Sequence, residues 1–112
     1  MPTKDSTVKE GEKTLLKLET LLIICQAQGA ACGRLRGLGE EEIVFATDSS
    51  QEIADRFSAG FRWDGSFVNL EELEKVREDN GGSERIIRAR ILEIGAAEKS
   101  SLMNLLNGSN LS

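Results

Sequence analysis

The side chains that most often carry chemistry are scarce in this 112-residue chain. It contains no histidine and no tyrosine, and its two cysteines are Cys25 and Cys32. Histidine is the usual proton carrier near pH 7 and a common zinc ligand, so its absence excludes most acid–base and zinc sites. The C-x6-C spacing does not match a zinc site either. We therefore expect no enzyme, no metal and no cofactor, and interpret both cysteines as buried thiols, with a disulfide across a hairpin as the alternative.

Glycine and glutamate form two further motifs in the first half of the chain. Gly33, Gly37 and Gly39 give a G-x3-G-x-G pattern, which is neither the dinucleotide motif nor a P-loop. We interpret these glycines as turn or bulge residues. The acidic run 40–42 lacks the spread ligands and sharp glycine turn of a calcium loop, so we interpret it as a solvated loop.

Four of the five aromatic residues lie close together in the sequence: Phe57, Phe61, Trp63 and Phe67. Core packing is the simpler interpretation, because aromatic side chains dominate small cores. An Asp-Gly tight-turn signal follows Trp63, and a large ring at a turn is hard to bury completely. Trp and Arg are enriched in the centres of protein interfaces. We predict that Trp63, with Arg62 and Phe61, contacts a protein partner or a second copy of the chain.

Charge is distributed unevenly along the chain, whose formal net charge is −5. Segment 37–74 holds ten acidic and two basic residues, a local net charge of −8. Such a segment repels phosphate, so we expect no nucleic-acid binding; it suits either a basic protein partner or solubility alone. The longest apolar run, 21–25, is far below the roughly 20 residues that span a bilayer. With no recognisable signal peptide, we expect a cytoplasmic protein without membrane insertion.

The elements that position these residues are predicted from periodicity and turn signals. Residues 15–26 fit either a strand, from alternating apolar residues, or a helix ending at Gly29. Residues 31–36 and 43–46 predict two strands joined by a turn. Residues 84–94 alternate clearly and predict a further strand.

Three helices are expected in the second half of the chain. Ser49 and Glu52 fit a capping box for a short helix that ends before Gly60. Asn69 can cap a second helix over 70–78, and residues 98–106 predict a terminal helix that stops at Gly108. The length suits a single domain over 14–108, between a disordered tail at 1–13 and a short tail at 109–112.

Two stretches of the sequence resemble the PilZ family. Residues 33–47 are similar to its second and third strands. Residues 88–94 followed by 98–106 are similar to its last barrel strand and closing helix. The resemblance implies an α+β fold: a small antiparallel β-barrel-like sheet with a C-terminal helix, here with one or two inserted helices. It also implies a bacterial signalling role, because members act as cyclic di-GMP receptors or as adaptors in motility, pilus and exopolysaccharide systems.

The nucleotide-binding motifs that the resemblance implies are not matched. The family uses R-x-x-x-R, whereas Arg34 and Arg36 are two apart and no arginine precedes Leu15. Its D/N-x-S-x-x-G motif would fall at 37–42, which is acidic here. Bound phosphates need guanidinium donors, and carboxylates repel them. We predict that cyclic di-GMP does not bind strongly; a receptor with atypical ligands at Arg34, Arg36 or Arg62 is the alternative.

The favoured function is a non-catalytic regulatory or adaptor domain that acts through protein–protein contact. A second fold remains open, an α/β sandwich of the roadblock or profilin-like kind. That fold would begin with a helix over 13–28 and would make the chain a dimeric scaffold that regulates a small GTPase.

Overall fold

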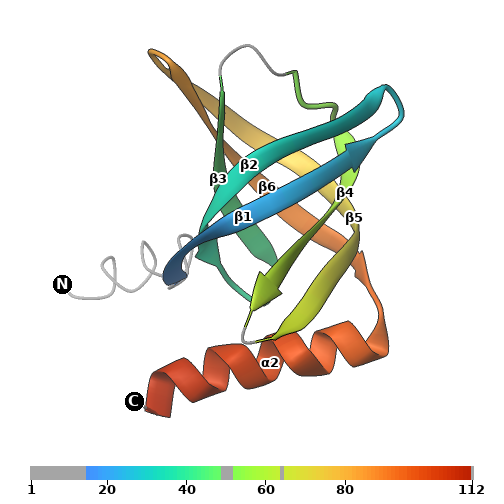
Figure 1. Cartoon of the computed structure of the whole chain (residues 1–112), viewed down its shortest axis with the longest axis vertical. Coiled ribbons are helices and arrows are strands. Elements are labelled where there is room, and N and C mark those ends of the chain that lie inside the picture. Colours follow the sequence, from blue (N-terminus) through green and yellow to red (C-terminus); the bar gives the residue numbers. More distant parts are fainter. Residues whose placement is uncertain (1–14, 49–51, 64, 112) are drawn as a thin grey trace, which may run out of the picture.

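The computed structural model describes residues 15–48, 52–63 and 65–111 of the chain. Six antiparallel strands form a closed barrel, and one helix follows them (Figure 1). The elements are β1 (Leu16–Gln26), β2 (Gly29–Leu38), β3 (Glu42–Asp48), β4 (Arg56–Trp63), β5 (Ser66–Gly81), β6 (Glu84–Ile94) and α2 (Ala96–Leu111). Their order around the barrel is β1-β2-β3-β6-β5-β4, and β4 pairs with β1 to close it. The α/β sandwich is therefore wrong, because its opening helix is replaced by β1.

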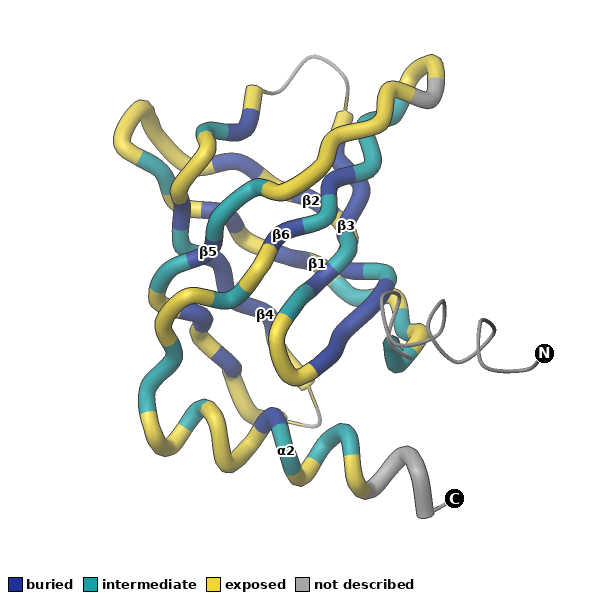
Figure 2. Tube along the Cα trace, turned by 180° about the vertical axis from the view of Figure 1, so that it is seen from behind, coloured by how far each residue is buried: buried dark blue, intermediate teal, exposed yellow. Residues whose placement is uncertain are grey.

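The hydrophobic core fills the inside of the barrel. Side chains of successive strand residues point to opposite faces, and Figure 2 shows buried and exposed positions alternating along the strands. The predicted alternation in β6 is confirmed, since Ile87 and Ala89 are fully buried. The largest fully buried side chains are Leu22, Ile24, Leu35, Leu38, Ile43, Phe45, Phe61, Val68, Leu70, Leu73, Ile87 and Leu102.

Helix α2 lies across one end of the barrel (Figure 1). Leu102 is buried, and Leu105 and Leu106 pack against the core with part of their surface exposed. The terminal helix predicted at 98–106 is confirmed, although α2 continues to Leu111, beyond the expected stop at Gly108. The described part of the chain holds no helix that is long and apolar enough to cross a membrane.

The short helix expected before Gly60 does not form in the described residues. Residues 52–54 are irregular and β4 begins at Arg56; the proposed cap, Ser49, lies outside the described residues. Phe57 faces the core as part of a strand that pairs with both β1 and β5. Burial between two neighbouring strands outweighs a local capping signal, because strand formation depends mainly on tertiary packing.

The second expected helix, 70–78, is also wrong, because these residues belong to β5. Leu70 and Leu73 are both buried and lie three residues apart, a spacing typical of a helix. In the structure the register of β5 against β6 shifts between Leu70 and Glu72 and again between Glu72 and Leu73. Each β-bulge adds one residue to a strand, so side chains three apart can both face the core. The first shift places the extra residue on β5 and so gives this strand a helix-like spacing, whereas the second places its extra residue on β6.

The cysteines also correct the sequence interpretation. Cys25 and Cys32 are both exposed on the outer face of the barrel. Cys25 pairs with Ala30, and Cys32 pairs with Ile23, so the cysteines are diagonal neighbours rather than directly opposite. The inward residues of β1 are Leu22 and Ile24, and the alternation places Cys25 outside. The expected tail at 1–13 lies outside the described residues.

Candidate functional site

Arg34 and Arg36, the proposed atypical nucleotide ligands, lie next to each other on the outer face of β2. Both are bracketed by carboxylates. Glu19 of β1 lies 3.9 Å from the Nε atoms of both arginines. Glu84 of β6 lies 3.6 Å from Arg34 Nη2 and 3.3 Å from Arg36 Nη2. The structure therefore brings the two arginines together, but in a four-charge cluster in which two carboxylates balance two guanidinium groups.

The turn between β2 and β3 lies within the segment 37–42, where the resemblance would place the second family motif. Gly39 N–H donates to the Glu42 carbonyl at 2.9 Å, which closes the turn. A Cβ atom on Gly39 would lie 2.7 Å from the Leu15 side chain, which supports its interpretation as a structural glycine. The Glu42 carboxylate pairs with Arg88 at 3.2 Å. At this turn a phosphate would meet the exposed carboxylates of Glu40 and Glu41.

The proposed partner-binding residues lie where β4 turns into β5. Trp63 pairs with Ser66, and Gly65 between them has a φ of 81°, so the predicted tight turn is confirmed. Trp63 is 37% exposed and Arg62 is exposed. Phe61 is only 1% exposed and belongs to the core. Its assignment as a contact residue is corrected, because inward-facing strand positions of a closed barrel cannot reach a partner.

Comparisons with known proteins bear on the fold. No protein-family profile matches the sequence, and no curated protein matches it. Among solved structures, the chain is similar to the PilZ domain of CeSA from a cellulose-synthesizing bacterium, with a TM-score of 0.59 and 14% identity. The superposition covers 88% of this chain and 99% of that one. The chain has a PilZ-like fold. At this identity, the likeness concerns the fold alone.

The outer wall of this PilZ-like barrel carries exposed apolar side chains that the sequence analysis did not select. Leu21 is 57% exposed and Ile23 is 40% exposed on β1, and Phe67 is 52% exposed on β5. Their signal was present in the sequence, as large apolar residues at the outward positions of amphipathic strands. These residues can be recognised as outward-facing only once the inward-facing residues of each strand are known. We call Leu21, Ile23 and Phe67 the outer apolar patch.

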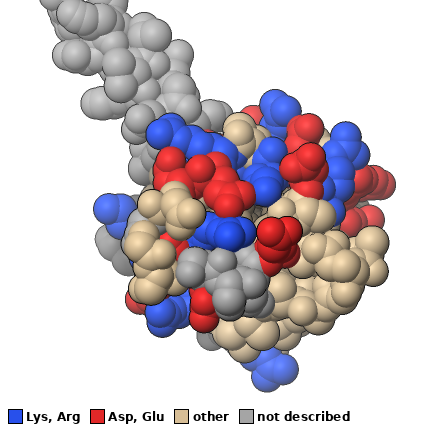
Figure 3. All heavy atoms as spheres, turned by 90° about the horizontal axis from the view of Figure 1, so that it is seen from above, with Lys and Arg blue, Asp and Glu red and all other residues tan. Residues whose placement is uncertain are grey.

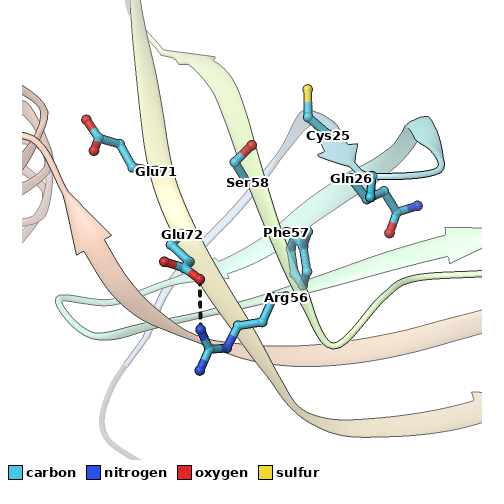
Figure 4. A pocket seen from close by; sticks show the side chains of 8 residues that line it. Cys25, Gln26, Arg56, Phe57, Ser58, Glu71 and Glu72 are labelled. Atoms are coloured by element: carbon cyan, nitrogen blue, oxygen red, sulfur yellow. Dashed lines mark hydrogen bonds and ion pairs between the residues drawn. The ribbon is translucent and has the colours of Figure 1, made fainter.

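A shallow hollow of about 390 Å³ opens beside the outer apolar patch (Figure 4). Cys25, Ser58 and Glu71 line it from three neighbouring strands. Arg56 and Glu72 also line it and form an ion pair of 2.8 Å. The hollow is polar and open to solvent, so it offers a place for a protruding side chain rather than an enclosed ligand site.

Charged side chains of both signs mix at the end of the barrel remote from α2 (Figure 3). A network of charged side chains also joins β5 and β6. Lys75 donates to Glu78 Oε1 at 2.8 Å, and Arg85 lies 3.2 Å from Glu78 Oε2. The Lys75 hydrogen bond, helped by the charges of Lys75 and Arg85, holds the pKa of Glu78 below its ordinary value, against an opposing effect of burial. Among the described residues, no three metal-binding side chains come together.

Proposed function

We propose that this PilZ-like domain is a non-catalytic regulatory or adaptor module that acts by protein–protein contact in the cytoplasm. The observation that carries the proposal is the four-charge cluster of Glu19, Arg34, Arg36 and Glu84. The arginines that could hold a phosphorylated ligand already have carboxylate partners within the fold. The degenerate motifs and this pairing together argue against a nucleotide as the recognised molecule.

The physical reason is the competition between an incoming phosphate and the resident carboxylates. A phosphate gains forked hydrogen bonds from a guanidinium group only if that group is available. Here the phosphate would have to displace Glu84 from Arg36 while Glu19 remains close by. Like charges repel at such distances, so the cluster opposes anion binding at this face.

The proposed contact surface is the β4–β5 turn, with Trp63 as its centre and Arg62 beside it. Trp63 is partly exposed at a turn, which gives a partner access to a large aromatic surface. Aromatic and arginine side chains of this kind dominate the binding energy of many interfaces. One similar solved structure is the PilZ domain of CeSA, which is consistent with a regulatory module but identifies no partner here.

Calorimetric titration with cyclic di-GMP tests the nucleotide part of the proposal. We expect no saturable binding. A dissociation constant near 1 μM, about −8 kcal/mol, would overturn it and favour the atypical receptor. In that event, Arg34→Ala and Arg36→Ala should abolish the binding, whereas Arg77→Ala, an exposed arginine on β5, should not.

An affinity pull-down from the native host tests the contact part. We expect wild-type chain to retain a partner that Trp63→Ala loses. Val76→Ala, which changes an exposed apolar residue on β5 away from the β4–β5 turn, serves as the matched control and should retain it. Equal retention of the partner by wild type and Trp63→Ala would remove Trp63 from the contact surface.

A further inference from the structure

The outer apolar patch lies on β1 and β5, on the two sides of β4. Ile23 pairs with Gly60 of β4, and Leu21, two residues earlier on the same face of β1, reaches the level of Arg62. Arg62 in turn pairs with Phe67 of β5. The outer face of β4 at Gly60 and Arg62 is therefore flanked by Leu21, Ile23 and Phe67. Three large apolar residues so exposed and so close together are typical of an interaction surface rather than of isolated surface positions.

Gly60 makes the centre of this wall flat. A Cβ atom on Gly60 would lie 2.5 Å from Cζ of Phe67. The Phe67 ring therefore lies over the backbone of β4 and extends from β5 toward Ile23. The absence of a side chain at Gly60 lets the ring bridge the strand, and it leaves a low apolar surface on which a second sheet can pack, with the usual spacing of about 10 Å between packed sheets.

The two ends of the patch along the strands carry opposite charges. Arg62 lies at one end, level with Leu21 and Phe67. At the other end, the hollow is lined by Cys25, Ser58 and Glu71, and also by Arg56 and Glu72, which form an ion pair with each other and leave Glu71 as the remaining charge. Arg62 and Ser58 are four residues apart on β4, which is about 13 Å along a strand. The surface thus has a basic, protruding end and an acidic, hollowed end, with Gly60 midway between them.

A surface with this arrangement is complementary to itself. A two-fold axis that lies in the plane of the face and crosses the strands at Gly60 exchanges the two ends. It brings Ile23 against Ile23 of the second copy. It also places Leu21 and Arg62 of one copy over the hollow of the other, with Leu21 above Cys25 and Arg62 near Glu71. Such an isologous contact closes after two subunits.

We propose that two copies of this PilZ-like domain associate through the outer wall of β1, β4 and β5, with Leu21, Ile23 and Phe67 at the centre. Arg62 of each copy pairs with Glu71 of the other. The hollow receives the side chains that protrude from the opposite end of the partner's face. The contact goes beyond the proposed partner-binding function, because it uses the barrel wall and does not need Trp63.

Sedimentation velocity over a concentration series tests the association with the full chain. Wild type is expected to change from monomer to dimer as its concentration rises. Leu21→Glu and Phe67→Glu are each expected to raise the dimer dissociation constant tenfold or more, because each buries a charge in the apolar centre. Val76→Glu, at an equally exposed apolar position outside the patch, is the control and should leave the constant unchanged.

Variants with reversed charges provide the decisive test. Arg62→Glu alone and Glu71→Arg alone should each weaken the dimer, because each sets like charges against each other. An equimolar mixture of these two variants should form heterodimers, since both charge pairs are then opposite in sign. The double variant should likewise regain self-association. A surface that attracts partners only by its apolarity would not show this rescue.

Four results would overturn the proposal. One is a wild-type chain that stays monomeric at every concentration reached. Another is a dimer that survives both Leu21→Glu and Phe67→Glu, and the third is a failure of the charge-reversed pair to form heterodimers. Trp63→Ala should leave the dimer intact, so the fourth result, loss of dimer in that variant, would assign the interface to the β4–β5 turn instead. The cyclic di-GMP titration is independent of all these outcomes.

Discussion

Gln26 ties the irregular segment before β4 to the barrel. Its side-chain amide donates to the Glu52 carbonyl at 3.0 Å, and its Oε1 accepts the Ala54 N–H at 2.8 Å. The Glu52 carbonyl and the Ala54 N–H lie outside the strands. The Gln26 side chain therefore takes the place of the hydrogen bonds that a neighbouring strand would make with them. Single side chains of this kind set the path of a segment that leads into the barrel.

We expect Gln26→Ala to lower the free energy of unfolding by about 1–2 kcal/mol, because it leaves two backbone groups without their partner. Gln28→Ala, at an exposed position in the adjacent β1–β2 turn, is the matched control and should change stability by less than about 0.5 kcal/mol. Urea unfolding of the three proteins measures the difference. Equal stability of both variants would show that solvent replaces the Gln26 contacts at no cost.

Glu78 couples the stability of the β5–β6 hairpin to pH. Its pKa is lower in the folded chain than in the unfolded chain, chiefly through the Lys75 hydrogen bond. The unfolded chain therefore binds more protons between the two pKa values, so stability rises with pH there. The contribution is complete above the ordinary pKa of 4.5 and is lost as the pH falls through the folded-state value.

Glu78→Gln should consequently destabilise the domain at pH 7 by about 1 kcal/mol or less, since the pair is near the surface. The difference from wild type should shrink as the pH drops below 4.5. Unfolding curves collected between neutral and acidic pH provide the test. A difference that stays constant over this range would mean that the Glu78 charge is not what stabilises the hairpin.

At the level of elements, α2 closes the barrel end that the strands leave open. Leu102 is 1% exposed and is part of the same core as the strand residues. We expect Leu102→Ala to cost about 2–4 kcal/mol of stability, because it leaves a cavity where helix and barrel meet. Leu92→Ala changes an exposed leucine on β6 and should cost much less. Denaturant unfolding compares the two, and similar losses would show that α2 is not part of the core.

β5 shows how an element can hide its type from the sequence. Its register shifts twice between Leu70 and Leu73 and again between Lys75 and Arg77. A bulge changes the phase of inward and outward side chains, so the strict period of two is lost where the bulges occur. The Asn69 capping signal, which supported a helix over 70–78, is overridden because these residues pair within the sheet.

At the scale of the whole molecule, closure joins the first half of the barrel to the second. β1 pairs with both β2 and β4, and β3 pairs with β6, so no strand of the barrel is held by only one neighbour. The core is one cluster that includes residues from all six strands and α2. Removing one strand would open the core to water, which favours all-or-none unfolding.

We therefore expect one cooperative unfolding transition. Trp63 is the single tryptophan of the chain, and its fluorescence reports the β4–β5 turn. Far-ultraviolet circular dichroism reports the whole barrel. The two signals should give the same midpoint and the same denaturant dependence, as a two-state domain requires. A Trp63 transition that precedes the loss of secondary structure would show that this turn opens independently.

The sequence alone determined the features that depend on local chemistry. The absence of histidine and of recognisable motifs directed the prediction toward a binding module. The alternation in residues 84–94 predicted β6, and the Asp-Gly signal after Trp63 predicted a tight turn. The resemblance at 33–47 and 88–106 predicted a barrel with a closing helix. These inferences needed only neighbours in sequence, because turn geometry and strand alternation are local properties.

Only the tertiary structure decided which face of each strand is buried. Cys25 lies outside the barrel and Phe61 inside it. Pairing with the neighbouring strands of the closed barrel fixes which alternate side chains of each strand point inward. The outer apolar patch and the pairing of Arg34 and Arg36 with Glu19 and Glu84 depend on strands far apart in sequence. The side chains of the patch and of the cluster come together only when these strands pair. The free energy of strand pairing depends on both strands, so neither segment alone predicts it.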